Sequence, residues 1–294
     1  MARFILSAFA DEAGVTLSEQ IAAMKENGIR FFEPRNIDGK GILDLTEEEL
    51  LAVRRALDEA GIRTGSLGSP IGKYPIEDDF DSYMTGAFAK AIRAAKILGT
   101  DKIRMFSFFV KPGELDLRRG EVIRRLTEMT KVAAENGVTL CHENEARIYG
   151  EMPERVADLF SAVPALGGIC DPANYRMADA DPVRGLEVTL PNFRYMHIKD
   201  AIYATKELLP AGEGEGRIAE LLNRVNEEID GEVMLTVEPH LFAFLAYKSI
   251  DDREMHGRHH FANNREAFDY AVKALKDLLI ANGYREDEKG YFTK

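Results

Sequence analysis

Short apolar runs alternate with longer amphipathic segments along the whole chain. The short runs are rich in β-branched and aromatic residues and have the length of strands, whereas the longer segments repeat their apolar positions with helical spacing. This alternation is typical of βα units arranged around a parallel sheet. The predicted strands cover residues 3–9, 29–34, 62–67, 102–108, 138–143, 167–171, 193–198 and 233–238.

Four of the segments between these strands are predicted helices that end in glycine, the residue that most readily adopts the left-handed conformation after a helix. The second of them opens on Thr46 with Glu49 three residues later, which is the pattern of a capping box. A last helix is predicted at about 262–282, followed by a polar C-terminal tail at about 283–294. The four helices that end in glycine cover residues 16–28, 45–61, 81–99 and 120–137.

Eight βα units in 294 residues predict an α/β fold, a single (β/α)8 TIM barrel, rather than an open doubly wound sheet, which usually has fewer strands. No linker rich in proline, glycine or serine marks a second domain, so residues 1–294 are expected to form one domain. No GxGxxG motif follows the first strand, which argues against a dinucleotide site. The glycine-rich stretch 211–217 lacks the ending of a phosphate-binding loop, and we expect a flexible connection there.

Composition and charge narrow the class of protein further. Hydrophobic residues make up 45% of the chain and charged residues 30%, the ordinary mixture of a soluble globular protein. The formal net charge of −12 repels a phosphate backbone, so nucleic acid is not an expected partner. Two cysteines are too few for a disulfide framework, and the apolar stretch at the N-terminus is too short for a signal peptide or a membrane span. We therefore expect a cytoplasmic protein without a membrane partner.

Ionisable side chains stand at the carboxyl ends of four consecutive predicted strands. Active sites of (β/α)8 barrels form at these strand ends. Three carboxylates and an imidazole that converge there would repel and desolvate one another unless a cation lay among them, which predicts a divalent metal ion. The oxygen-rich set favours Mn²⁺, Mg²⁺ or Co²⁺ and permits Zn²⁺. The predicted ligands are Glu143, Asp171, His197 and Glu238.

The alternation of side chains along a strand sorts the neighbouring residues between the two faces of the sheet. Cys141 shares a face with Glu143, whereas Cys170 points to the opposite side of its strand, and both are interpreted as core residues. His142 is expected to point outward toward the helices. Lys199 and His240 share the parity of His197 and Glu238, so both line the pocket if the strands extend that far. An isolated acid at a strand end is more often a helix N-cap or a loop salt bridge than a ligand, and only the series of four points to a metal.

Four short motifs make the sequence resemble the xylose isomerase-like TIM barrel superfamily, specifically its sugar phosphate isomerase/epimerase group. The motifs are HENE at 142–145, CDPANY at 170–175, HIKDA at 197–201 and VEPH at 237–240. The resemblance covers almost the entire chain and implies a TIM barrel that holds one divalent ion with Glu143, Asp171, His197 and Glu238. It also implies that Glu143 and Glu238, on either side of the substrate, exchange protons with a carbohydrate.

The sequence departs from some members of this superfamily at two places. Certain ketose 3-epimerases and the apurinic-site endonucleases have histidine three residues after the Asp of the sixth strand, where this chain has Asn174. The endonucleases also need histidines near the ends of the second and third strands for a trinuclear zinc site, and the stretches 30–36 and 63–70 contain none. DNA repair is therefore not the expected activity, and a specific assignment to the ketose 3-epimerases is weakened.

Further polar residues are candidates for lining the barrel mouth. The predicted substrate contacts are Lys199, Glu145, Asn174, His240 and Arg35, and Glu33 and Ser107 are additional candidates. Arg and Lys suit a substrate with an anionic or carbonyl oxygen. The alternatives are that Arg35 is a surface loop residue and that Glu145 pairs with Arg147. The histidines in HGRHHF, residues 256–261, suggest a second metal site as a further alternative.

The primary hypothesis is an intracellular, divalent-metal-dependent isomerase or epimerase of a small sugar, sugar phosphate or polyol derivative, working by proton transfer through an enediolate. A second hypothesis uses the same metal and acids to dehydrate a keto-inositol or a related β-hydroxy ketone. A third is a non-catalytic sugar- or metabolite-binding barrel, and the fourth is a metal-free structural protein. The substrate, the reacting carbon, the metal and the oligomeric state, a homodimer among the options, are left open.

Overall fold

All eight predicted strands are present in the computed structural model, which describes residues 1–242 and 259–294. The third predicted strand, 62–67, contains the short β5, and a further strand, β6, begins at its last residue and runs beyond it. The strands are β1 (Ala2–Ala8), β2 (Phe31–Phe32), β5 (Arg63–Thr64), β6 (Leu67–Ile71), β7 (Lys102–Met105), β8 (Thr139–Glu143), β9 (Gly167–Cys170), β10 (Phe193–Ile198) and β13 (Gly231–Val237).

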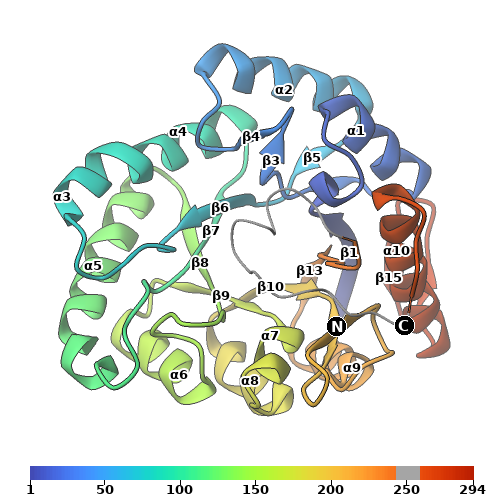
Figure 1. Cartoon of the computed structure of the whole chain (residues 1–294). Coiled ribbons are helices and arrows are strands. Elements are labelled where there is room, and N and C mark those ends of the chain that lie inside the picture. The colour runs from blue at the N-terminus through green and yellow to red at the C-terminus, as the bar shows by residue number, and fades with distance from the viewer. Residues whose placement is uncertain (243–258) are drawn as a thin grey trace.

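These strands pair in parallel around a ring, which gives the predicted TIM barrel (Figure 1). The ring is completed by the third predicted strand, because β5 pairs with β2 while β6 pairs with β7. Gly65 lies between β5 and β6, and a Cβ there would be 2.3 Å from the sulfur of Met234. A side chain at this position would therefore have to displace Met234 and crowd Phe31.

Helices surround the barrel on its outer side (Figure 1). The capping box predicted at Thr46 and Glu49 is confirmed, and Thr16 and Glu19 form another. The predicted helix 81–99 is found in three parts, α3 (Phe80–Tyr83), a π-helical turn over Met84–Phe88, and α4 (Ala89–Leu98). The other helices are α1 (Leu17–Glu26), α2 (Glu47–Ala60), α5 (Leu115–Glu135), α6 (Pro153–Ala162), α7 (Pro172–Met177), α8 (Pro182–Thr189), α9 (Ile218–Glu228) and α10 (Asn264–Ala281), with 3-10 turns at Ala10–Glu12 and Leu190–Asn192.

The C-terminal residues form a hairpin rather than a polar tail. Strands β14 (Arg285–Glu286) and β15 (Tyr291–Thr293) pair with each other, and β15 continues the sheet antiparallel to β1. Strand β2 reaches only the last two residues of β1, so without β15 the first half of β1 would leave unpaired backbone groups. Phe292 fills the same gap with a fully buried ring.

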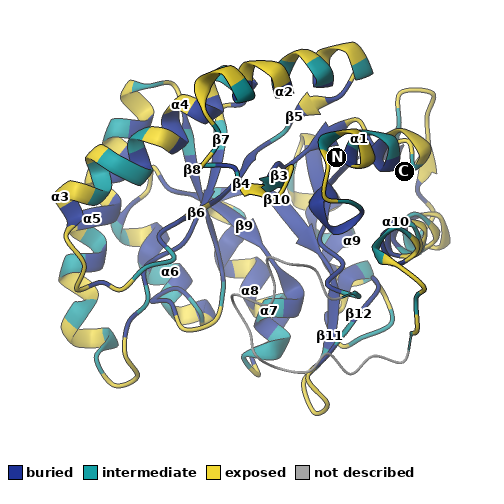
Figure 2. Ribbon diagram, turned by 45° about the horizontal axis from the view of Figure 1, so that its top comes forward, coloured by how far each residue is buried: buried dark blue, intermediate teal, exposed yellow. Residues whose placement is uncertain are grey.

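Two apolar clusters form the core. The cluster inside the barrel consists of residues from the inner faces of the strands, including Cys141, whereas Cys170 belongs to the larger cluster outside, as the alternation predicted. Figure 2 shows the barrel strands buried and the exposed residues gathered on the outer faces of the helices and in the loops. Two short hairpins, β3 (Asn36–Ile37) with β4 (Lys40–Gly41) and β11 (Asp200–Ile202) with β12 (Glu207–Leu209), follow the second and seventh barrel strands.

Within the residues that the structure describes, no helix is long and apolar enough to span a bilayer.

Candidate metal centre

The four predicted ligand residues lie together at the carboxyl ends of four neighbouring strands. Glu143 ends β8, Asp171 follows β9, His197 lies near the end of β10 and Glu238 follows β13. These strands are consecutive in the sheet (Figure 1). One ligand atom from each side chain lies within 4.8 Å of the others, and all four residues are buried.

The Nδ1 atom of His197 faces two of the acids. It lies 3.1 Å from Oε1 of Glu143 and 3.7 Å from Oε2 of Glu238, yet it is buried without a hydrogen bond of acceptable geometry. Burial disfavours the imidazolium, but Glu143 and Glu33 outweigh this and raise the pKa of His197 to about 10. The position therefore demands positive charge, and three carboxylates with one bare imidazole nitrogen fit a divalent ion.

Two buried cations already contact these acids. The Nζ atom of Lys199 lies 2.5 Å from Oδ2 of Asp171 and 2.6 Å from Oε2 of Glu238. Arg104 donates from Nη1 to Oε2 of Glu143 at 3.3 Å. Burial would raise the pKa of Glu238, but Lys199 and the other nearby cations hold it well below its usual value. Glu143 and Glu238 are thus kept ionised, which is the form that binds a metal, whereas burial raises the pKa of Asp171 to about 6 despite Lys199.

Arg104 is a residue of the site that the sequence analysis missed. It lies in β7, and its guanidinium also donates to the carbonyl oxygens of Ser69 and Gly68 while lying over the rings of Phe9 and Phe106. The available signal was a single arginine inside the apolar run KIRMFSF. A charge in the middle of a barrel strand is expensive to bury, so it indicates partners inside the barrel.

Arg35 is a largely covered residue, its side chain 13% exposed, with several carboxylate partners, and it is not a surface loop residue. It donates twice to Asp11, at 2.9 and 3.0 Å, once to Glu12 at 3.1 Å and once to Oε1 of Glu238 at 2.9 Å. Glu12, Glu238 and His240 form a second acid and histidine group, but the guanidinium of Arg35 already supplies a cation there. Burial raises the pKa of Glu12 to about 8 and lowers that of His240 to about 4. His240 lies beside Glu238, but not by strand parity, because β13 (Gly231–Val237) ends before it and its φ of 50° turns the chain there.

Two asparagines brace the strand ends that carry the ligands. Asn174 donates to Oε1 of Glu143 at 3.2 Å and to the carbonyl oxygen of Asn144 at 2.9 Å. The side chain of Asn144 in turn exchanges two hydrogen bonds with the backbone of Asp171, at 2.9 and 3.0 Å. Asn174 thus holds Glu143, one of the predicted ligands, in position.

Glu145 forms an ion pair with Lys73, from the connection that follows β6, at 2.9 Å. Burial would raise the pKa of Glu145, but Lys73 lowers it overall. The ammonium of Lys73 also lies 4.4 Å from the centre of the Phe106 ring. The pair lies beside Glu143 at the mouth, where a substrate would contact it. The alternative that Glu145 pairs with Arg147 is wrong, because its ion pair is with Lys73.

Two other candidates for the mouth lie elsewhere. Glu33 is fully buried in the interior beneath the four ligands, where it contacts Nε2 of His197. Ser107 lies outside the sheet, because its hydroxyl contacts Nε2 of His142 at 3.0 Å. His142 points outward as predicted, its ring against Phe160 of α6, and burial lowers its pKa to about 3.

The glycine-rich stretch 211–217 is ordered around a carboxylate and is not a flexible connection. Asp200 accepts backbone hydrogen bonds from Gly212 and Gly216 of this stretch. Glu213, which belongs to the same stretch, contacts His259, with 2.7 Å between Oε2 of Glu213 and Nε2 of His259. Of the histidines suggested as a second metal site, His259 therefore has an acid partner in this loop, and His256 lies outside the described residues.

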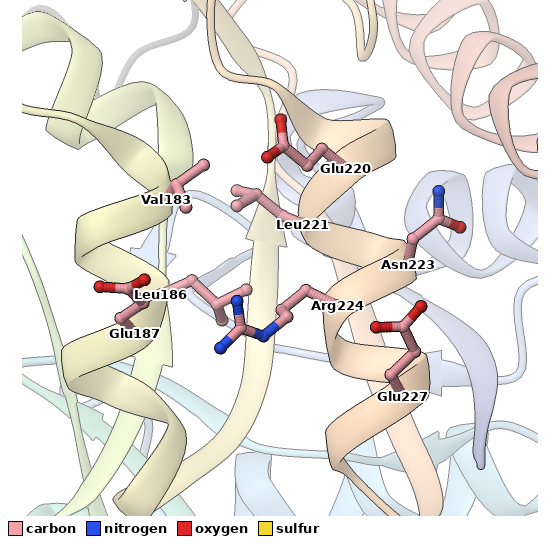
Figure 3. Close-up of a pocket in the computed structure, with 8 residues that line it drawn as sticks. All are labelled: Val183, Leu186, Glu187, Glu220, Leu221, Asn223, Arg224 and Glu227. Carbon is pink, nitrogen blue, oxygen red and sulfur yellow. The ribbon is translucent and has the colours of Figure 1, made fainter.

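A groove on the outer surface is separate from the mouth. It has a volume of about 200 Å³ and lies between α8 and α9 (Figure 3). Val183, Leu186 and Leu221 form its apolar part, and charged side chains such as Glu187 and Arg224 line its edge. No residue of the acid and histidine cluster lines it, so it does not compete with the mouth as the candidate site.

The parallel barrel and the cluster of acids and histidine at its strand ends together define a class of barrels with a candidate metal centre at the mouth. The chain belongs to the xylose isomerase-like TIM barrel family, whose model matches residues 21–278. No curated protein sequence matches the chain.

Solved structures with the same fold match nearly the whole chain. The IOLI protein with a bound zinc atom has a TM-score of 0.71 and 14% identity, covering 94% of this chain and 97% of its own. An L-ribulose 3-epimerase has a TM-score of 0.70 and 15% identity, covering 96% of both chains. The probable 3-DHS dehydratase AsbF from Bacillus anthracis has a TM-score of 0.68 and 15% identity, covering 94% of this chain and 99% of its own. At these identities the likeness shows a shared fold.

Proposed function

We propose that this protein is a divalent-metal-dependent isomerase or epimerase of a small sugar, sugar phosphate or polyol derivative. One observation carries the proposal: Glu143 and Glu238, from strands separated by β9 and β10, meet in one buried cluster with Asp171 and His197. The zinc atom in the IOLI structure and the epimerase among the similar structures support it as analogies of fold.

The proposed ligands of the ion are Glu143, Asp171, His197 through Nδ1, and Glu238. When bound, a divalent ion would polarise a substrate carbonyl and favour loss of a proton from the neighbouring carbon. Its identity, Mn²⁺, Zn²⁺, Mg²⁺ or Co²⁺, is left open, because oxygen ligands with one imidazole suit each of them.

The two glutamates are the proposed proton carriers. Arg104 donates to Glu143 and Arg35 donates to Glu238, so each carboxylate has a guanidinium that fixes it. If one glutamate removes a proton from a substrate carbon and the other returns it on the opposite face, the product is an epimer. If the same glutamate moves the proton to an adjacent carbon, the product is an isomer.

The remaining residues have proposed roles in binding. Lys199 contributes an ammonium within the cluster, and Lys73 with Glu145 contributes a polar pair at its edge, suited to hydroxyl groups of a carbohydrate. Three further residues already contact the two glutamates, and we propose that they also bind the substrate. These residues are Asn174, Arg35 and His240. A cytoplasmic location and a homodimer are compatible with this proposal and are not part of its support.

A dehydratase is the second candidate, and Lys199 is the observation that favours it. Its ammonium lies 2.6 Å from Glu238, so a proton donor stands next to a proposed base. Removal of a proton by the glutamate and donation of one by the ammonium to a departing hydroxyl would release water from a β-hydroxy ketone.

The test is a screen of ketoses, sugar phosphates and inositol ketones in D₂O with each of the four metals. Uptake of deuterium at carbon without a change in formula indicates an isomerase or epimerase, and a product lighter by one water indicates the dehydratase. Glu143→Gln and Glu238→Gln should each abolish turnover, whereas Glu121→Gln, on the outer surface of α5, is the matched control and should leave it intact. Full activity in both mouth variants would exclude the mechanism. Tight binding without any exchange would point to a non-catalytic barrel.

A further inference from the structure

Glu33 is a carboxylate buried in the centre of the barrel, below the candidate metal centre. It follows β2 and is completely inaccessible to solvent. The hydroxyl of Tyr195 lies 2.8 Å from Oε1 and that of Thr236 lies 2.9 Å from Oε2. The third partner is Nε2 of His197, at 3.4 Å from Oε1 and 3.3 Å from Oε2. Both oxygens of Glu33 are therefore engaged on the side of the imidazole that faces away from the other ligands.

The directions of these hydrogen bonds follow from which groups can donate. An ionised carboxylate only accepts, so Tyr195 and Thr236 donate to Glu33. Tyr195 has one proton, and its second contact, 2.9 Å to the hydroxyl of Ser66, must then be one that it accepts. For His197 the geometry decides: Nε2 has contacts of hydrogen-bond geometry with Glu33, whereas Nδ1 has none, so in the neutral ring that a metal ligand must be the proton belongs on Nε2.

A neutral imidazole has one N–H, so a proton on Nε2 leaves Nδ1 with a free lone pair. Nδ1 is the atom that faces Glu143 and Glu238 and has no hydrogen bond of its own. The tautomer favoured by Glu33 is thus the one that presents a ligand atom to the cluster. A proton on Nδ1 instead would place the Nε2 lone pair against the carboxylate of Glu33.

We propose that Glu33 is a positioning residue, which fixes the tautomer and the orientation of His197 so that Nδ1 binds the metal. This inference rests on the metal centre of the proposed function and adds a residue that does not itself bind the ion. A cation at Nδ1 withdraws charge from the ring and strengthens the Nε2–H bond to Glu33, a coupling that partners of metal-bound histidines provide in general.

The buried charge of Glu33 is also explained by this role. Within residues 1–242 and 259–294, its one recorded ion pair is with His197. A fully buried carboxylate without a compensating charge costs several kcal/mol, and an apolar side chain would fill the space at lower cost. A divalent ion bound at Nδ1 would supply that compensation through His197.

The experiment compares Glu33→Gln with Thr236→Val in chelator-competition titrations with Co²⁺ and Zn²⁺. Gln keeps the size of the side chain but removes the charge that orders the imidazole, so we expect the metal affinity to fall about 10- to 100-fold. Thr236→Val removes one donor to Glu33 and leaves the contact with His197, so its affinity should stay within about threefold of wild type. Glu33→Asp keeps the charge and should recover part of the loss; it also serves if Glu33→Gln does not fold.

A second measurement separates positioning from general loosening of the core. In the zinc-loaded wild type, long-range ¹H–¹⁵N correlations of His197, assigned by loss of its signals in His197→Gln, should show a proton on Nε2 and the metal on Nδ1. In Glu33→Gln the Nε2 proton should exchange faster with solvent.

Equal affinities in wild type and Glu33→Gln, or a proton on Nδ1 of His197 in the loaded wild type, would overturn the inference and leave the metal centre standing. If the wild type bound none of the metals, the proposed function would fall with it.

Discussion

Replacing Asp200 should destabilise the protein far more than an ordinary loop aspartate would. Asp200 begins β11, directly after Lys199, and its carboxylate accepts three backbone hydrogen bonds. The donors are Ala201 at 2.9 Å, Gly212 at 3.0 Å and Gly216 at 2.7 Å. A Cβ at Gly216 would lie 2.7 Å from Oδ1 of Asp200, so the loop encloses this carboxylate closely.

The expected magnitude follows from the donors that would lose their acceptor. Each buried N–H left unpaired costs about 1–3 kcal/mol, and those of Ala201 and Gly216 are buried, whereas that of Gly212 is half-buried and can turn to water. Asp200→Ala should therefore lower the free energy of unfolding by about 4 kcal/mol. Asp200→Asn keeps an oxygen that can accept from Ala201 and Gly216, but its NH₂ group faces the N–H of Gly212, so that hydrogen bond is lost. The free energy of unfolding should therefore fall by about 1–2 kcal/mol. These are large fractions of a typical total of about 5–15 kcal/mol.

The assay is urea unfolding followed by circular dichroism, in the presence of a chelator so that metal binding does not contribute. Asp101→Ala is the control, because this side chain is 71% exposed and its ion pair is with the adjacent Lys102. The order of midpoints should be the control near wild type, then Asp200→Asn, then Asp200→Ala. An Asp200→Ala midpoint equal to that of the control would refute the reasoning and return the glycine-rich stretch to the flexible connection first expected.

Three further outcomes are expected. Ser107→Ala removes the acceptor that Gly150 N uses at 2.7 Å, as well as the partner of His142, so urea unfolding should show a loss of about 1–3 kcal/mol; an unchanged midpoint would contradict this. Burial raises the pKa of the Cys141 thiol to about 12 and that of Cys170 still higher, so neither should react with a thiol reagent at pH 8 until urea unfolds the protein, and rapid labelling of the native state would disprove it. Adding a metal at about 100 times its dissociation constant should raise the melting temperature by about 5 °C over the chelated protein, corresponding to about 2.7 kcal/mol, and a melting temperature that does not respond to any of the four metals would count against the metal centre.

The positions of the four proposed ligand residues could be predicted from sequence because they depend on local rules. Each follows or ends an apolar run, the side chains alternate along a strand, and consecutive βα units place their strand ends side by side. The same rules placed His142 outward and Cys141 inward. These predictions use only the period of a strand and the order of strands along the chain, both of which are written into the sequence within a few residues.

The partners of those side chains could not be predicted in the same way, because they lie far away along the chain and only side-chain packing inside the barrel selects them. Arg104 is 39 residues from Glu143, and Glu33 is 164 residues from His197. Which pairs meet depends on how side chains from different strands share the interior, and no periodicity describes that. The C-terminal hairpin could not be predicted for a related reason. Its strands are too short to show a pattern, and a single buried ring, that of Phe292, packs it against the barrel.

Lys199 illustrates how a residue can be placed correctly by sequence and yet have a role that only the structure suggests. Alternation put it in the pocket, where it was expected to meet substrate, and the structure pairs its ammonium with Asp171 and Glu238, two of the proposed ligands. An ammonium and a divalent ion are both attracted to the same carboxylates, and the doubly charged ion is attracted more strongly at equal distance. Metal binding should therefore loosen the hold of these acids on Lys199. The freed ammonium would then be able to turn to an oxygen of the substrate, which reconciles the pairing seen here with the binding role.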